Sequence, residues 1–400
     1  MDRVILHCDC NGFFASVETV LDPSLRDVPM AVCGDEQERH GIILAKNELA
    51  KKYGIVTAET VYSARKKCPG LVTRAPHYDA YVDFSKRANA IYLEYTDLVE
   101  QFGIDESWLD VTASLRLFGS GERIADEIRR RVREEIGITV SVGVSFNKTF
   151  AKLGSDYKKP DATTVISRDN FKKIVHPLPV GDLLFVGKST VRELATLGIR
   201  TIGELASVDP IILERRLGKA AYVLTKYARG EDDSPVTPDS HDKAKSIGNG
   251  YTFRHDLTTL EECRAGIDFL CEEIGTKLRL KGLCCSTVAL TIKDNFLHSV
   301  QRQRPLPSPT DISEEIAREA FHLLRDNWRE NYPIRMLTVT VTSLESKDLQ
   351  CMQIDLFGEG DERKKSRAKE ETVDIIRQKF GGASIVRGST LDTDIGISKK

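Results

Sequence analysis

Carboxylates at the ends of two apolar segments constrain the fold of this chain more than any other feature of its sequence. Asp9 ends an apolar segment that starts at Val4, and Asp105 and Glu106 interrupt a second one. A carboxylate inside a β-core is costly unless it is paired or binds a metal ion. Three carboxylates that converge from adjacent strands would supply the hard oxygen ligands of divalent ions such as Mg²⁺. The simpler interpretation is acidic residues in turns.

Two such ions in one site would have a defined chemistry. They can activate a hydroxyl group and neutralise the charge that builds on a transferred phosphoryl group. Beside Asp9, Phe13 and Phe14 could stack on the ring of a substrate, although core packing is the simpler interpretation. The segment therefore indicates phosphoryl-transfer chemistry, provided that the three carboxylates meet in space.

Charge is unevenly distributed along the 400 residues. Lys and Arg total 58 against 60 Asp and Glu, a net charge of −2, so the whole chain lacks the basic excess of a general polyanion binder. Residues 1–110 contain 12 basic and 18 acidic residues, whereas residues 146–230 contain 15 and 8. An acidic segment followed by a basic one suggests metal ions in the first and phosphate groups in the second.

The nine cysteines and eight histidines form no disulfide or zinc pattern. The cysteine count is odd and no Cys-x-x-Cys pair occurs, which indicates reduced thiols. No apolar stretch approaches the roughly 18 residues of a membrane span. We therefore expect a cytoplasmic protein with no membrane partner.

The order of apolar segments predicts an α+β protein of several domains. Strands alternate with helices over residues 1–166, and short helices split by glycines follow from residue 167. Pro235 and Pro238 lie among Asp and Ser in a segment with the composition of a linker. Beyond it the pattern predicts the order βαββαβ. Residues 345–400 have the composition of a charged tail with one short helix.

Two segments suit phosphate binding. Lys148, Lys152, Lys158 and Lys159 lie on or beside one short helix, where a solvated charge run is the simpler interpretation. Residues 184–199 resemble a helix-hairpin-helix, in which a glycine turn exposes backbone N–H groups that bind DNA phosphate without reading its sequence. A nucleotide P-loop is excluded there because position 182 is Asp instead of glycine.

Together these residues resemble the Y-family translesion DNA polymerases, of the DNA polymerase IV type. Three motifs carry the resemblance in matching order and spacing over residues 1–345. They are residues 5–18 (ILHCDCNGFFASVE), residues 103–110 (GIDESWLD) and residues 142–160, which begin VGVSFNK and end with Lys159 and Pro160.

The resemblance implies a right-handed palm, fingers and thumb with a βαββαβ little-finger domain. The expected boundaries are the palm at 1–10 and 78–166, the fingers at 11–77, the thumb at 167–230, a linker at 231–243, the little finger at 244–345 and a tail at 346–400.

The motifs also imply the roles of individual residues. Asp9 and Asp105 would bind both of two Mg²⁺ ions and Glu106 one of them, and the backbone carbonyl of Cys10 would complete a site. Phe14 falls on the steric-gate position, where a ring blocks the ribose 2′-OH. Further residues would contact the triphosphate or the DNA. For the triphosphate they are Phe13, Asn47, Lys51 and Lys159, and for the primer–template DNA they are Lys152, Gly187, Lys188, Ser189, Arg302 and Arg304.

The fingers depart from the family pattern. Relatives usually carry Tyr-Glu-Ala-Arg, whose Tyr and Arg hold the triphosphate, whereas Asn47 and Lys51 are the nearest equivalents here. A lysine ammonium lacks the bidentate fork of arginine. The triphosphate contacts of this segment therefore differ from the usual ones.

Residues 353–357 (QIDLF) resemble the pentapeptide by which bacterial polymerases bind the sliding clamp. An extended peptide that presents Leu356 and Phe357 suits a hydrophobic groove, with Gln353 at its edge. The sliding clamp is therefore an expected partner.

The resulting hypothesis is a monomeric, low-fidelity DNA-directed DNA polymerase for translesion synthesis, which uses dNTPs and lacks proofreading. Two alternatives belong to other classes. One is a non-catalytic DNA-binding accessory of the clamp, and the other is a metal-dependent nuclease with helix-hairpin-helix modules.

Overall fold

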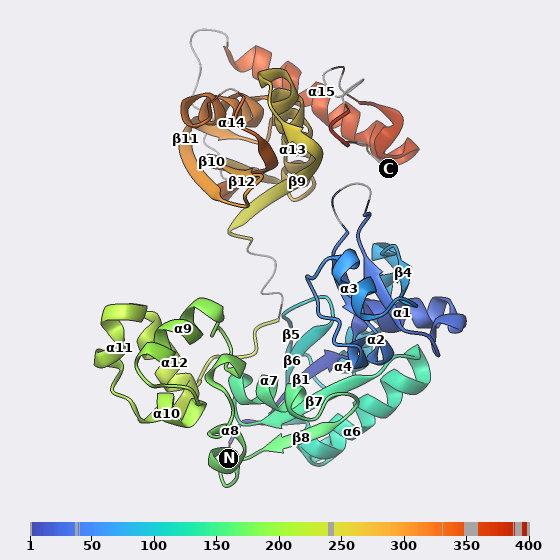
Figure 1. The fold of residues 1–400 in the computed structure, drawn as a ribbon, viewed down its shortest axis with the longest axis vertical. Helices are drawn as coiled ribbons and strands as arrows, with labels where there is room; N and C mark the ends of the chain where they lie inside the picture. The colour runs from blue at the N-terminus through green and yellow to red at the C-terminus, as the bar shows by residue number, and fades with distance from the viewer. Residues whose placement is uncertain are drawn as a thin grey trace. The chain divides into compact units, whose positions relative to one another are not determined.

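The computed structural model describes residues 2–36, 39, 41–238, 244–329, 331–347, 359–386, 388 and 394–397. Its internal contacts divide the chain into two compact units. The first is Met1–Gly34 with Ile42–Asp242, and the second is Asp35–Gly41 with Lys243–Lys400. Figure 1 shows the elements of each unit.

A five-stranded sheet forms the centre of the first unit. Its strands are β5 (Val99–Gln101), β6 (Glu106–Asp110), β1 (Ile5–Cys10), β7 (Val140–Ser145) and β8 (Thr163–Ile166), in that order. β1 is antiparallel to both β6 and β7, and β7 is parallel to β8. The helices of this layer are α4 (Tyr78–Leu93), α6 (Gly121–Arg131) and α7 (Lys148–Tyr157), with the short α5 (Leu115–Phe118) before α6.

The two faces of β1 have different roles because side chains alternate along a strand. Leu6, Cys8 and Cys10 are buried in one cluster with residues of α4 and α6. The odd-numbered side chains lie on the other face, where Ile5 packs with Ala151 of α7. Residues 7 and 9 therefore project on the side of the sheet that α7 covers.

Two glycines allow α7 to lie directly on β7. A Cβ atom at Gly143 would lie 1.9 Å from the carbonyl oxygen of Ala151, and one at Gly154 would lie 2.9 Å from the Cα of Gly143. Both distances are far shorter than a van der Waals contact, so no other residue fits while the helix keeps this approach. The approach fixes where the side chains of α7 meet the face of β1.

A second, three-stranded sheet has its own core in the first unit. Its order is β3 (Ile43–Lys46), β2 (Met30–Cys33) and β4 (Val72–Arg74), with α2 (Glu48–Lys52) and α3 (Val61–Lys67). α1 (Phe13–Leu21) begins after Gly12, whose φ of 52° is left-handed. Phe13 belongs to the cluster of the five-stranded sheet and Ala15 to a cluster with Met30, so α1 joins the two sheets.

Five helices follow the first sheet and share one hydrophobic cluster. They are α8 (Phe171–Val175), α9 (Lys188–Thr196), α10 (Ile202–Ser207), α11 (Pro210–Leu217) and α12 (Ala220–Arg229). The predicted short helices split by glycines match this region: Gly198 and Gly218 follow α9 and α11 with positive φ angles.

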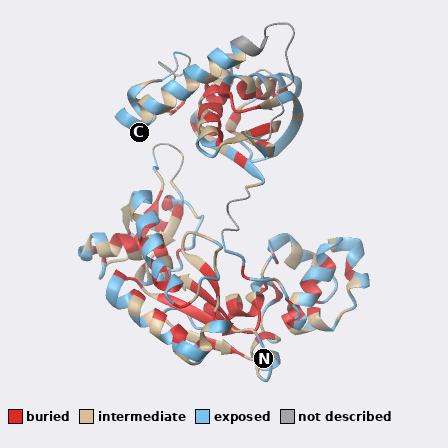
Figure 2. Ribbon diagram, turned by 180° about the vertical axis from the view of Figure 1, so that it is seen from behind, coloured by how far each residue is buried: buried red, intermediate tan, exposed pale blue. Residues whose placement is uncertain are grey.

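The second unit has the predicted βαββαβ order. β9 (Ser246–Leu257), α13 (Leu260–Leu280), β10 (Leu283–Asp294), β11 (Ser299–Thr310), α14 (Ser313–Asn327) and β12 (Ile334–Ser346) follow one another along the chain. They form an antiparallel sheet of order β11-β10-β12-β9. Figure 2 shows buried residues concentrated on its strands and on the helices that cover them.

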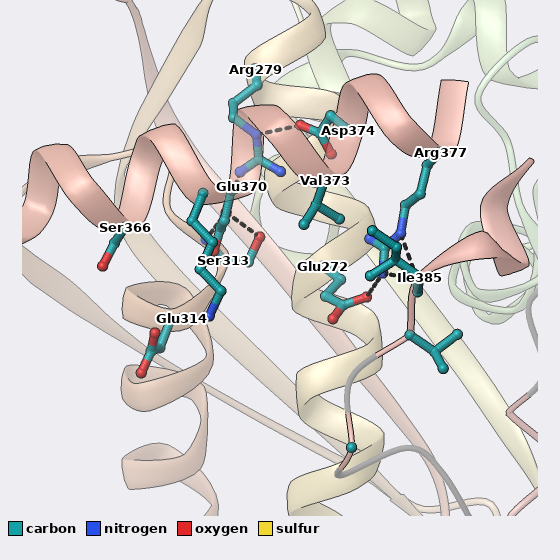
Figure 3. A pocket seen from close by; sticks show the side chains of 13 residues that line it. Glu272, Arg279, Ser313, Glu314, Ser366, Glu370, Val373, Asp374, Arg377 and Ile385 are labelled. Atoms are coloured by element: carbon teal, nitrogen blue, oxygen red, sulfur yellow. Dashed lines mark hydrogen bonds and ion pairs between the residues drawn. The ribbon is translucent and has the colours of Figure 1, made fainter. Parts of the chain in front are cut away.

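The expectation of a charged tail with one short helix is wrong. α15 (Glu359–Phe380) is a 22-residue helix that packs against α13 and α14 through charged groups (Figure 3). Arg279 of α13 donates from Nε to Asp374 at 2.6 Å and also contacts Glu370, which accepts a 2.8 Å hydrogen bond from Ser313. Among the described residues no helix, α15 included, is both long and apolar enough to cross a membrane.

Candidate active site

Three carboxylates lie together at the end of β1, and we call them the acidic centre: Asp9, Asp105 and Glu106. Asp9 is directly opposite Glu106 in the register of β1 and β6. The backbone N–H of Cys10 donates a 2.9 Å hydrogen bond to the carbonyl of Asp105. The two apolar segments of the sequence are thus adjacent strands, and their acidic residues share one end of the sheet.

Two lysines neutralise part of this charge: Lys152 in the middle of α7 and Lys159 two residues after its end. Lys159 Nζ lies 2.8 Å from Asp9 Oδ2 and 2.7 Å from Asp156 Oδ1. Lys152 Nζ contacts Glu106 Oε2. Three carboxylates therefore share two ammonium groups, and the acidic centre keeps an excess of negative charge.

That excess changes the proton affinities of the site. Burial, and then the negative charges of Asp9 and Glu106, raise the pKa of Asp105 to about 6. Burial acts to raise the pKa of Glu106 as well, but the contacts with His7 and Lys152 and the Lys152 charge lower it to about 2. Burial acts to lower the pKa of Lys159, but the carboxylates of Asp9 and Asp156 raise it. A divalent cation would relieve the repulsion that Asp105 experiences, so these residues fit such an ion.

His7 is part of the same cluster, although the sequence gave us no reason to select it. Ligand atoms of His7, Asp9 and Glu106 lie within 4.8 Å of one another. Asp105 is not a member of that trio. His7 and Asp9 are two residues apart on a strand and so lie on the same face, and this spacing could have identified His7 from the sequence.

The side chain of Cys10 turns away from the acidic centre. It is 3% exposed in the core, and burial raises the pKa of its thiol to about 12. Its Sγ lies 4.0 Å from Tyr92 Oη. The thiol is therefore not a metal ligand, and the role that the resemblance implies for Cys10 would use its backbone carbonyl.

The two phenylalanines of α1 differ in exposure. Phe13 is 3% exposed and packs in the core, so its ring is not free to contact a nucleotide. Phe14 is half-buried and stacks on Tyr81, with ring centroids 4.1 Å apart and planes 11° apart. Tyr81 is itself held by a hydrogen bond from its hydroxyl to Glu18. Phe14 is therefore a rigidly supported ring at a surface.

Asn47 and Lys51 occupy different environments in α2. Asn47 caps the helix: its Oδ1 accepts from the N–H groups of Ala50 and Met30, and its Nδ2 donates to the carbonyl of Val28. These bonds commit the Asn47 side chain to local structure. Lys51 is exposed, 3.6 Å from Glu48, and so its ammonium can reach a ligand.

The residues predicted to bind DNA differ in exposure and in their ion pairs. Gly187, Lys188 and Ser189 are exposed where α9 begins. In the other unit Arg302 is exposed on β11, whereas Arg304 pairs with Asp326 at 2.7 Å. Lys152 lies at the acidic centre instead, against Glu106. The predicted clamp residues Gln353, Leu356 and Phe357 fall outside the described residues.

Family models match both parts of the chain. Residues 8–156 match the impB/mucB/samB family, and residues 244–356 match the C-terminal domain of the same family. Together the two matches span more than half of the sequence and include the acidic centre.

Curated relatives align over nearly the whole chain. A protein of Acetivibrio thermocellus named DNA polymerase IV is 48% identical over 400 residues, which is all of both chains. The DNA polymerase IV of Moorella thermoacetica is 40% identical over 398 residues, covering 99% of this chain and 98% of that one. DNA polymerase IV 1 of Bacillus subtilis is 36% identical over 397 residues, covering 99% and 95%.

The fold also matches a solved structure, a chimera of the Y-family DNA polymerases Dbh and Dpo4. The TM-score is 0.76, with 24% identity over 86% of this chain and 99% of that one. At this identity the match supports the fold alone, which is the predicted palm, fingers, thumb and little-finger architecture.

Proposed function

The chain belongs to the impB/mucB/samB family, and from that premise we propose how it acts on DNA. It is a DNA-directed DNA polymerase of the translesion class, which extends a primer 3′-OH with deoxynucleotides across damaged template. The observation that carries the chemistry is the pairing of Asp9 with Glu106 on adjacent strands, with Asp105 beside them.

The acidic centre would hold two Mg²⁺ ions, helped by the carbonyl of Cys10. When bound, the ions activate the primer hydroxyl and neutralise charge on the transferred phosphoryl group. Lys159, which pairs with Asp9, is close enough to the centre to bind the phosphates of the incoming nucleotide. Lys51 supplies a second, more exposed ammonium for the triphosphate.

Primer extension tests this function directly. We expect the wild-type protein with Mg²⁺ and all four dNTPs to extend a primer on an intact template and past an abasic site. Degradation of the primer when dNTPs are omitted would favour the nuclease alternative. Binding of primer–template without extension would favour the accessory alternative.

Phe14 is proposed as the steric gate because its ring is held against Tyr81 at a surface. Phe14→Ala should raise ribonucleotide incorporation by about tenfold or more with a modest loss on dNTPs, because the clash acts only on the substrate with a 2′-OH. Phe14→Tyr keeps the ring and is the matched control. Unchanged ribonucleotide use by Phe14→Ala would make Phe14 a packing residue only.

We propose the domain boundaries given by the resemblance: palm 1–10 and 78–166, fingers 11–77, thumb 167–230, linker 231–243 and little finger 244–345. Separate clusters of the two sheets support the division between palm and fingers. The cluster of α8 to α12 supports the thumb, although it also includes Phe150 and Leu153 of α7. α1 belongs to both the palm and the fingers by its packing. The enzyme is proposed to act as a cytoplasmic monomer.

DNA binding is proposed to use exposed groups in two domains, Gly187, Lys188 and Ser189 in the thumb and Arg302 and Arg304 in the little finger. Lys188→Ala should weaken binding equally on unrelated sequences and reduce the slope of log affinity against log salt by about one. A sequence-dependent loss would contradict a phosphate contact.

Gln353, Leu356 and Phe357 are proposed to bind the sliding clamp, on the pattern of their sequence alone. Replacing Leu356 and Phe357 with Ala should abolish stimulation by the clamp and leave basal extension intact, because the acidic centre lies in another domain. Equal loss of basal extension and thermal stability would indicate a structural role instead.

A further inference from the structure

His7 and Lys152 contact the same oxygen of Glu106 from two different elements. His7 Nε2 of β1 lies 3.3 Å from Glu106 Oε2, and Lys152 Nζ of α7 contacts that oxygen too. From this geometry we propose that His7 and Lys152 are positioning residues, which orient the Glu106 carboxylate for the divalent cation. The proposal rests on the proposed function, because it assigns how that metal site is built.

His7 is held inside the protein, with its Nε2 directed toward Glu106. Its side chain is fully buried, and its Nδ1 forms a 2.8 Å hydrogen bond with Ser155 Oγ. Among the described residues its Nε2 has no regular hydrogen bond, and the Glu106 carboxylate is the acidic group in contact with it. A buried polar atom is costly without a partner, and a proton on this nitrogen would meet Glu106 Oε2 at 3.3 Å.

His7 and Lys152 are also connected to each other. Ser155 Oγ, the partner of His7, donates a 2.7 Å hydrogen bond to the carbonyl of Lys152. The ring of Trp108 packs edge-on against His7 at a centroid distance of 5.1 Å. The imidazole and the ammonium are therefore set by one rigid arrangement of β1, β6 and α7.

Fixing one oxygen of Glu106 leaves the other for a ligand. A Cβ atom at Gly103 would lie 3.5 Å from Glu106 Oε1 and 3.4 Å from Asp105 Oδ1, so these two oxygens lie beside the same backbone position. Oε2 faces His7 and Lys152 instead. A carboxylate held in this way presents Oε1 on the side of Asp105 without having to reorient when the cation binds.

This role differs from the DNA contact that the sequence suggested for Lys152. The side chain is 20% exposed and its ammonium is taken up by Glu106, whereas Lys188 is exposed on the thumb. Lys148, one turn earlier on α7, is a matched control. It has a similar exposure and pairs with Glu100 at 2.7 Å, away from the acidic centre.

The test measures Mn²⁺ binding to the full-length protein by electron paramagnetic resonance, with a primer–template whose primer ends in a dideoxynucleotide. We expect His7→Phe and Lys152→Met each to weaken Mn²⁺ binding by about tenfold or more, as substitutions behind metal ligands commonly do. His7→Gln and Lys152→Arg keep a donor and should recover part of the affinity. Lys148→Met should bind Mn²⁺ like the wild type.

Affinity for primer–template and its salt dependence are measured on the same variants. We expect both to match the wild type for Lys152→Met. Mn²⁺ affinity within about twofold of the wild type in both His7→Phe and Lys152→Met would overturn the proposal. A salt slope reduced by about one in Lys152→Met, with Mn²⁺ binding unchanged, would make Lys152 a DNA contact instead.

Failure of the proposed function gives a different result. In that case the wild-type protein itself would not extend primers or would not bind Mn²⁺ at the acidic centre. The inference about His7 and Lys152 fails when the wild type does both and the two variants bind Mn²⁺ as tightly as the wild type.

Discussion

The acidic centre and the contact between α13 and α15 both place charged groups out of water, but they balance charge differently. In the acidic centre three carboxylates share two lysines, and the pKa of Asp105 is raised. Between α13 and α15, Arg279 meets both Glu370 and Asp374, and Arg377 meets Glu272 at 2.9 Å (Figure 3). Each of the three carboxylates between the helices contacts an arginine, and these pairs hold two elements together. In the acidic centre the lysines contact Asp9 and Glu106, so among the described residues Asp105 is the carboxylate suited to a cation from solution.

The largest effect is expected on catalysis, when a carboxylate of the acidic centre is removed. Asp9→Ala removes a proposed ligand of both ions and should lower the single-turnover rate of extension by about a thousandfold or more. Affinity for primer–template should stay near the wild-type value. Asp126→Ala, which removes an exposed carboxylate on α6, is the control. Near-normal turnover by Asp9→Ala would exclude it as a metal ligand.

Between α13 and α15, Arg279→Met should open the contact that holds α15 in place. Removing one partner leaves Glu370 and Asp374 without their main cation, and we expect the opening free energy of α15 to fall by about 3 kcal/mol. Amide hydrogen exchange over Glu359–Phe380 measures it. Arg304→Met breaks an exposed pair in the same domain and should cost about 0–1 kcal/mol. Equal losses in the two variants would show that the charges of α15 contribute nothing specific.

Asp105→Asn is expected to raise the stability of the protein, whereas Arg279→Met lowers that of α15. The folded protein binds the Asp105 proton more tightly than the unfolded chain does, because its pKa is raised from 3.8 to about 6. The stability from this group is fully present below pH 3.8 and is lost as the pH rises through about 6. Asparagine mimics the neutral form at every pH. The metal-free variant should therefore be more stable than the wild type by about 2 kcal/mol near neutral pH.

Denaturant unfolding in the presence of a chelator measures this difference. The gain should vanish below the unfolded pKa of 3.8, where the wild-type carboxyl is also protonated. A loss of stability near neutral pH would contradict the picture of an over-charged acidic centre.

The smallest effect on stability is expected for Lys51→Ala, which removes the exposed ion pair with Glu48. We expect the free energy of unfolding to change by less than about 0.5 kcal/mol, because exposed ion pairs contribute little. The KM for dNTPs should rise severalfold if Lys51 binds the triphosphate, and steady-state kinetics measure it. An unchanged KM would remove Lys51 from the nucleotide site.

Local sequence patterns predicted the order of strands and helices and the candidate carboxylates at the strand ends. The apolar segment that ends at Asp9 and the break at Asp105 and Glu106 made these residues candidates, and the family resemblance implied their roles. Strand and helix patterns gave the βαββαβ order. Partner choice was not readable in the same way. Lys152 was visible as a positive charge, but the sequence does not say whether it faces Glu106 or a phosphate.

The length of α15 and its packing on the second sheet were missed for a related reason. Its contacts are ion pairs with residues far away in the chain, such as Arg279 with Glu370, and a charged helix has no apolar stripe that predicts docking. Such pairs follow from the tertiary fold and leave no periodic signal in the sequence.

The contact of α7 with β7 limits how this enzyme can change during evolution. At Gly143 a single methyl group would overlap the carbonyl of Ala151, so even alanine would displace the helix that carries Lys152 and Ser155. Gly70, before β4, by contrast has open space where a Cβ would stand. Random mutagenesis with selection for growth under DNA damage should therefore recover many residues at position 70 and glycine alone at position 143.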